Sequence, residues 1–123
     1  MTSVVWVEVP VKDIERAARF YKSVFQLEAG NVQDDGARRT LTLFGDGGSG
    51  GPGFSLNQTA NFEPGDRGIY VYIDCGADLS EHLGRIEPAG GIVVTGKTYM
   101  AGAGYYASVK DTEGNLFALY SVT

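Results

Sequence analysis

The chain has 123 residues, 43% of them hydrophobic, which suits one domain that folds without disulfides or metals. A formal net charge of −5, with ten scattered basic residues, argues against a nucleic-acid partner, because phosphate binding needs clustered lysine and arginine. No apolar run approaches the length that spans a bilayer, so we expect no membrane partner. Cys75 is the only cysteine and the N-terminus lacks a signal-peptide pattern, so we expect a cytoplasmic protein.

Residues 4–27 predict a strand followed by a helix. Three valines alternate with Trp6, Glu8 and a proline, so one face of the strand is apolar and the other is partly aromatic and partly charged. From residue 14 the apolar spacing changes to that of an amphipathic helix. Asp13 is suited to cap its start and Gly30 to close its end.

The rest of the chain repeats this pattern. A hairpin with a glycine-rich tip is predicted at 39–57, a linker at 59–67, a strand at 68–73, a helix capped by Asp78, a short strand at 92–95 and a hairpin at 105–121. Each half then reads strand, helix and three strands. The prediction is an α+β fold of two βαβββ modules, about 4–58 and 68–121, within a single domain spanning 1–123.

Two stretches carry a resemblance to a known family. These are VPVKDIERAARFY at 9–21 and DTEGNLFALY at 111–120. Together with the duplicated pattern, they resemble the vicinal oxygen chelate superfamily, which includes glyoxalase I, bleomycin-resistance proteins and extradiol dioxygenases. The resemblance implies a cleft lined by residues that point away from the helices, with the modules paired either within one chain or across a dimer. We expect a homodimer.

The resemblance also allows a test for a metal site. Metal-dependent members of the superfamily use His, Gln or Glu at four cleft positions, and these positions correspond here to Trp6, Ser55, Gly68 and Ala118. None of the four is a usual ligand, and the chain has a single histidine, His82. The sequence therefore predicts a protein without a metal or another cofactor, and the metal-based chemistry of the best-known relatives is not transferred.

The expected cleft combines aromatic area with a few polar groups, which is typical of small-molecule pockets. Strand parity predicts that the ligand-binding residues are Trp6, Glu8, Ser55, Asn57, Tyr70, Tyr72, Ala118 and Tyr120. The aromatic rings can stack on a planar ligand, and a cationic ligand is a candidate because Glu8 supplies negative charge. In the alternative interpretation, the aromatic side chains fill the cleft or pack in a dimer interface.

Two functions remain open at this point. The first is a glyoxalase/bleomycin-resistance-like protein that binds a small planar molecule without a metal. The alternative is a metal-independent isomerase or lyase that acts on a small carbonyl compound. In that case Glu8, beside an apolar ring, is the candidate general base, and Tyr70 or Tyr72 donates to the developing oxyanion. The sequence favours binding, because the cleft has more aromatic than titratable groups.

Overall fold

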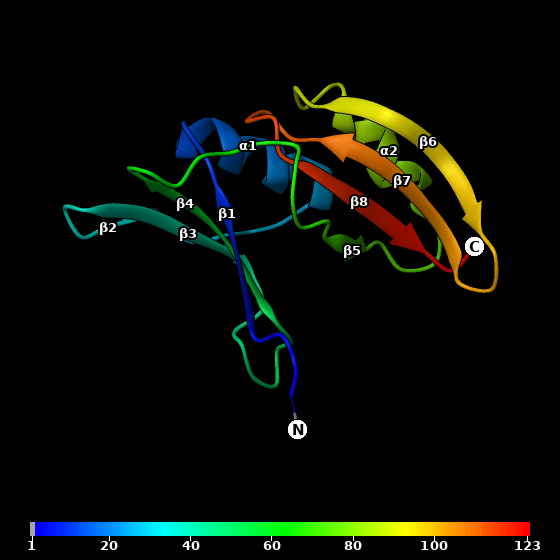
Figure 1. The fold of residues 1–123 in the computed structure, drawn as a ribbon, viewed down its shortest axis with the longest axis horizontal. Helices are drawn as coiled ribbons and strands as arrows, with labels where there is room; N and C mark the ends of the chain where they lie inside the picture. The colour runs from blue at the N-terminus through cyan, green and yellow to red at the C-terminus, as the bar shows by residue number, and fades with distance from the viewer. Residues whose placement is uncertain (1) are drawn as a thin grey trace.

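The computed structural model describes residues 2–123, which form two four-stranded sheets and two helices (Figure 1). The strand orders are β1-β4-β3-β2 in the first sheet and β5-β8-β7-β6 in the second. The element bounds are β1 (Trp6–Pro10), α1 (Ile14–Phe25), β2 (Gln33–Asp34), β3 (Arg38–Phe44), β4 (Gly53–Thr59), β5 (Tyr72–Asp74), α2 (Ser80–Ile86), β6 (Ile92–Met100), β7 (Gly104–Lys110) and β8 (Leu116–Ser121). The expected α+β class with two βαβββ modules is confirmed.

Helix α1 starts where the sequence predicts. The Asp13 side chain accepts a hydrogen bond from the Arg16 backbone N–H at 3.0 Å, so Asp13 is the N-cap. The end of the helix was predicted wrongly, because Gln26, rather than Gly30, takes the left-handed conformation that closes it. The backbone N–H of Gln26 donates to the carbonyl of Lys22.

The second module departs further from the pattern predicted for it. In place of the strand expected at 68–73, the structure forms only the three-residue strand β5, which begins at Tyr72. Ile69, which precedes it, is 91% exposed. Asp78 does not cap α2. Its carboxylate accepts hydrogen bonds from the backbone of Ser80 and from Lys97, while Leu79 occupies the cap position without a side-chain bond. Strand β6 is longer than expected, because it continues to Met100 and pairs with β7.

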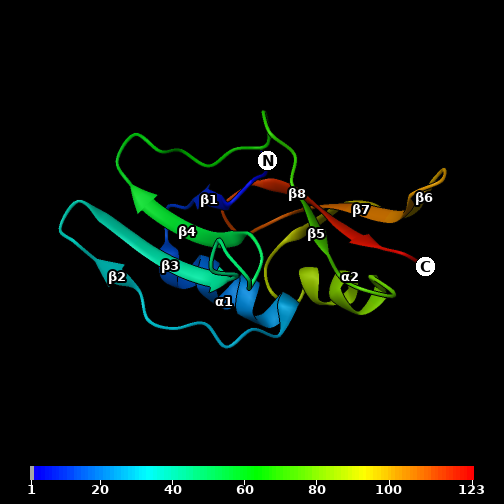
Figure 2. The ribbon, with the colours of Figure 1, turned by 90° about the horizontal axis from the view of Figure 1, so that it is seen from below.

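The two modules lie side by side within one chain. Both helices cover the same side of the two sheets, and the other side of each sheet is left uncovered (Figure 2). Each module pairs its first strand in parallel with its last, β1 with β4 and β5 with β8. The sheet faces that point away from the helices therefore lie on one side of the molecule.

A buried hydrogen-bond network joins the modules. Tyr21 on α1 is 1% exposed, and its hydroxyl donates to Asp111 Oδ2 at 2.7 Å across the module boundary. Asn115, in the turn between β7 and β8, donates from Nδ2 to the carbonyl of Pro10 at 2.8 Å and to Asp111 Oδ2 at 3.0 Å. The β7–β8 turn of module 2 is thereby fastened to the start of α1 in module 1.

Glu113 in the same turn adds to these contacts, and we call the whole set, formed by Tyr21, Asp111, Glu113, Asn115 and their partners, the latch. Its carboxylate accepts hydrogen bonds from the backbone N–H groups of Lys12 and Asp13, each at 2.9 Å, and pairs with the Arg16 guanidinium at 2.8 Å. Burial alone raises the pKa of the Glu113 carboxyl. Hydrogen bonds from Arg16 and from the two backbone N–H groups outweigh burial and lower that pKa to about 2.

Candidate functional site

Module 1 presents a polar face on the side away from α1. Trp6 Nε1 donates to Ser55 Oγ at 3.0 Å, and Asn57 Nδ2 donates to Glu8 Oε1 at 3.2 Å. Ser55 and Asn57 are 3% and 4% exposed. They lie on the neighbouring strand β4, on the same face of the sheet as Trp6 and Glu8. The four site residues predicted in this module therefore form two hydrogen-bonded pairs.

Arg38 is a site residue that the sequence prediction missed. Its guanidinium Nη2 lies 3.1 Å from Glu8 Oε2. The alternation of β3 could have predicted this residue. Leu41 and Leu43 face the core, so the even-numbered residues that precede them in this strand, Arg38 among them, lie on the uncovered face. Because of this ion pair, the face offers a matched pair of charges rather than the lone carboxylate expected from sequence.

Module 2 presents a tyrosine face. The rings of Tyr70 and Tyr72 meet edge to face with centroids 5.0 Å apart, and the Tyr70 hydroxyl is hydrogen-bonded to Ser108 Oγ. Ala118 is opposite Tyr72 in the ladder and is fully buried. Tyr120 lies further along β8, where its hydroxyl donates to the carbonyl of Ala103.

A cavity of about 710 Å³ lies along the junction of the modules and brings together Trp6, Glu8 and Tyr70. A smaller cavity of about 300 Å³ shares Tyr70 and is also lined by Tyr72. We call these two adjoining hollows the cleft. Of the remaining predicted residues, Ser55, Asn57 and Ala118 lie on the same sheet faces but are buried, and Tyr120 is held by its bond to the β6–β7 turn.

Cys75 is poorly suited to act as a nucleophile. Burial raises the pKa of its thiol to about 11, so the reactive thiolate is scarce near neutral pH. The thiol is within 3.6 Å of the carbonyl of Ile73 and packs against the core.

Within residues 2–123, no helix is long and apolar enough to cross a membrane.

Comparison with known proteins identifies the family. The sequence model of the Glyoxalase/Bleomycin resistance protein/Dioxygenase superfamily matches residues 3–119. The chain belongs to this superfamily. The match covers both modules, so it confirms the resemblance seen in the sequence. The comparison with curated proteins found no match.

Solved structures of superfamily proteins share the fold over nearly the whole chain. A glyoxylase/bleomycin resistance protein/dioxygenase domain from Frankia sp. EAN1pec has a TM-score of 0.77 at 13% identity, covering 100% of this chain and 99% of that one. TnmS3, an antibiotic binding protein from Streptomyces sp. CB03234, has a TM-score of 0.72 at 24% identity, with coverage of 100% and 98%. The fosfomycin resistance protein FosX from Listeria monocytogenes, complexed with Mn(II), has a TM-score of 0.73 at 14% identity, with coverage of 100% and 94%.

The residues at the superfamily's metal positions do not fit a metal ion in this chain. Trp6 and Ser55 are hydrogen-bonded to each other, and Ala118 is buried and has no donor atom. The ladder also corrects the fourth position. Glu8 is opposite Ser55 in module 1, and Tyr72 is opposite Ala118 in module 2, so Tyr72 corresponds to Glu8. Two residues earlier in the chain, the counterpart of Trp6 is therefore Tyr70 rather than Gly68. Within residues 2–123, no three His, Cys, Asp or Glu side chains converge as a metal site requires.

Proposed function

We propose that this superfamily member binds a small planar organic molecule in the cleft without a metal ion. The observation that carries the proposal is the cavity of about 710 Å³ shared by Trp6, Glu8 and Tyr70. Its size lies in the range of drug-sized ligand pockets, and it combines aromatic walls with a few polar groups. TnmS3, which shares this fold, is an antibiotic binding protein, and this supports the proposal that the present chain binds a small molecule.

The Glu8–Arg38 pair defines the polar end of the proposed ligand. A cationic group would approach Glu8 by displacing Arg38 from its 3.1 Å contact, and an anionic group would approach Arg38 by displacing Glu8. We propose that the ligand stacks on Trp6 and Tyr70 and presents a polar group to this pair.

The same contacts weigh against the enzyme alternative. A general base needs an oxygen that is free to take a proton from the substrate. Each oxygen of Glu8 already accepts one hydrogen bond, Oε1 from Asn57 and Oε2 from Arg38, so a substrate proton would have to reach the remaining lone pairs beside these donors. The aromatic walls of the cavity and these existing hydrogen bonds together favour binding as the proposed activity.

The experiment is a thermal-shift and calorimetric screen of planar aromatic metabolites and antibiotics on wild type, Trp6→Ala and Glu8→Gln. We expect a hit that stays chemically unchanged on long incubation and binds Trp6→Ala about tenfold or more weakly, because the stacking surface is lost. Glu8→Gln should weaken binding less. Turnover of a hit that Glu8→Gln abolishes while binding persists would favour the enzyme. Stoichiometric metal in protein purified without chelator would contradict the metal-free proposal.

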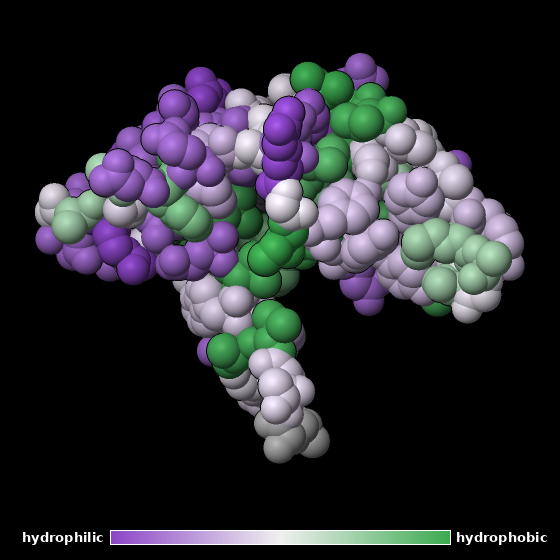
Figure 3. All heavy atoms as spheres, viewed as in Figure 1, coloured by the Kyte–Doolittle hydropathy of each residue, from purple (hydrophilic) through white to green (hydrophobic). Residues whose placement is uncertain are grey.

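We also propose that the functional unit is a homodimer. Large hydrophobic side chains are exposed along the junction of the modules, including Val4 at 66%, Ile69 at 91% and Tyr72 at 49%. Figure 3 shows hydrophobic surface gathered at this junction beside the hydrophilic surface of module 1. A second copy that covers this strip would remove it from water. Light scattering at micromolar concentration should give twice the chain mass, and a monomer throughout would contradict the proposal.

A further inference from the structure

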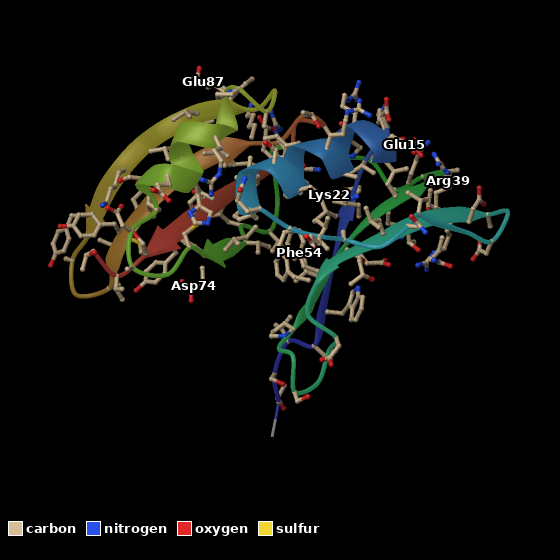
Figure 4. The ribbon with its side chains drawn as sticks, turned by 180° about the vertical axis from the view of Figure 1, so that it is seen from behind. Glu15, Lys22, Arg39, Phe54, Asp74 and Glu87 are labelled. Atoms are coloured by element: carbon tan, nitrogen blue, oxygen red, sulfur yellow. The ribbon has the colours of Figure 1, made fainter. Side chains whose placement is uncertain are left out.

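A second cavity of about 520 Å³ lies on the helix side of the module junction. It is bounded by the end of α1, by α2 and by the inner strands of both sheets. Figure 4 shows Phe54 in the space between the modules and Asp74 on the strand that faces it. The side chains that matter for its chemistry are Phe25, Leu27, Phe44, Phe54, Asp74 and His82.

This cavity adjoins the cleft, and the two share a wall formed by Val4, Val7, Phe54, Val71 and Tyr72. His82 and Leu27 line the second cavity and not the cleft, whereas Trp6 and Glu8 line the cleft and not the second cavity. Substitutions at these positions can therefore address one site at a time.

The lining is mainly apolar and combines aliphatic side chains with several aromatic rings. Phe44 and Phe54 are stacked with ring centroids 4.9 Å apart, and the rings of Phe25 and His82 lie 5.7 Å apart. Asp74 supplies negative charge and disfavours an anionic ligand at this site. A flat, uncharged molecule matches such walls, because it can stack on the rings without losing the hydration of a charge.

His82 is the polar group that has no protein partner in this setting. Its Nδ1 atom is buried and makes no hydrogen bond with any residue from 2 to 123. Buried polar side-chain atoms are usually satisfied, so an imidazole left this way is a candidate for recognising something else. Burial lowers the pKa of His82, with the nearby Arg85 contributing, so the ring is neutral at pH 7 and offers one donor and one acceptor nitrogen.

We propose that this cavity is a second binding site, which takes an uncharged planar aromatic molecule carrying a hydroxyl group, and that His82 recognises the hydroxyl through a hydrogen bond. Its volume of about 520 Å³ is enough for a two-ring compound. The hydroxyl binds a ring nitrogen, and the aromatic body is held among Phe25, Phe44 and Phe54. The unpartnered His82 nitrogen and the ring contacts support this site whether or not the cleft binds the ligand proposed for it.

The probes are 2-naphthol and naphthalene, which differ only by the hydroxyl group. Calorimetric titration of the wild-type protein should show saturable binding of one 2-naphthol molecule per protein chain and weaker binding of naphthalene. His82→Phe keeps an aromatic ring but removes both nitrogens, so 2-naphthol should bind about threefold to tenfold more weakly and naphthalene equally well. Leu27→Trp fills the cavity and should abolish binding of both probes.

Two further measurements keep the test decisive if a variant folds poorly. His82 is the only histidine, so its ring nitrogens give unambiguous NMR signals, and 2-naphthol should shift them in the wild type. Tyr99→Phe, on the exposed edge strand β6, is the matched control and should leave binding unchanged. The proposal is overturned if 2-naphthol does not saturate, if naphthalene binds as tightly, if the His82 signals do not move, or if only Trp6→Ala abolishes binding, which would place the probe in the cleft.

Discussion

The uncovered faces of the two modules share a topology and differ in chemistry. The face of module 1 is polar and hydrogen-bonded, with Trp6 held by Ser55 and with Glu8 held between Asn57 and Arg38. The face of module 2 is built from packed tyrosine rings, of which Tyr70 and Tyr72 make the central contact. The repeated backbone pattern thus carries an ion pair on one face and packed aromatic rings on the other.

The helix sides of the modules do not differ in this way. Corresponding positions such as Val9 and Ile73 are both buried in the core, at 9% and 7% exposure. Burial against a helix demands apolar side chains in both modules, whereas the uncovered faces are free of that demand. The asymmetry of the cleft therefore arises where packing leaves the choice of residue open.

The strongest expected effect comes from breaking the latch that holds the two faces beside each other. Glu113→Gln should lower the free energy of unfolding by about 2–3 kcal/mol, because the enclosed carboxylate bonds Arg16 and the backbone N–H groups of Lys12 and Asp13. Urea denaturation measures the change. Glu87→Gln on the surface of the second module is the matched control and should change stability by less than about 0.5 kcal/mol.

The same variant has a predicted pH dependence. Folding lowers the pKa of Glu113 from its ordinary value of 4.5 to about 2. A carboxyl of this kind adds stability above its unfolded pKa and loses that stability as the pH falls towards its folded pKa. The difference in the free energy of unfolding between wild type and Glu113→Gln should therefore shrink as the pH falls from about 5 to about 2. A difference between the two proteins that stays constant over this range would contradict the assignment.

Removing the buried hydroxyl at the centre of the latch should have a smaller effect. Tyr21→Phe deletes the 2.7 Å hydrogen bond to Asp111 and leaves that carboxylate its bond from Asn115. We expect a loss of about 1–2 kcal/mol in thermal or urea unfolding. Tyr99→Phe, at a side chain that is 62% exposed, should be close to neutral. Equal effects at the two positions would mean that the buried bond adds little.

The contrast between the faces can be tested directly by paired substitutions. Trp6→Phe breaks the bond to Ser55, which is 3% exposed, and should cost about 1 kcal/mol. Tyr72→Phe removes a hydroxyl from a ring that meets Tyr70 edge to face and is 49% exposed, and it should cost less than about 0.5 kcal/mol. If both substitutions left the free energy of unfolding unchanged, the hydrogen bond between Trp6 and Ser55 would not contribute to stability.

The smallest expected effect belongs to the Glu8–Arg38 pair. Its side chains are 34% and 48% exposed, so solvent screens their attraction. A double-mutant cycle with Glu8→Gln and Arg38→Gln should give a coupling energy of about 0.2–1 kcal/mol, decreasing with added salt. A larger coupling that is insensitive to salt would indicate that the pair is more enclosed than its exposure suggests.

The sequence by itself determined the elements whose signals are local. The apolar spacing from Ile14 and the capping side chain of Asp13 specify where α1 begins, because both act within one helical turn. Strand parity placed Trp6 and Glu8 on the face opposite the core, and the family resemblance was already visible. These predictions required only the period of a strand or helix.

Only the tertiary structure decided which of those residues meet. The pairing of Glu8 with Arg38 joins two strands 30 residues apart, and the Glu113 latch spans about 100 residues, so no local pattern could reveal either contact. The burial of Ala118 on the tyrosine face and the unpartnered nitrogen of His82 follow from tertiary packing, which the linear order of residues does not specify.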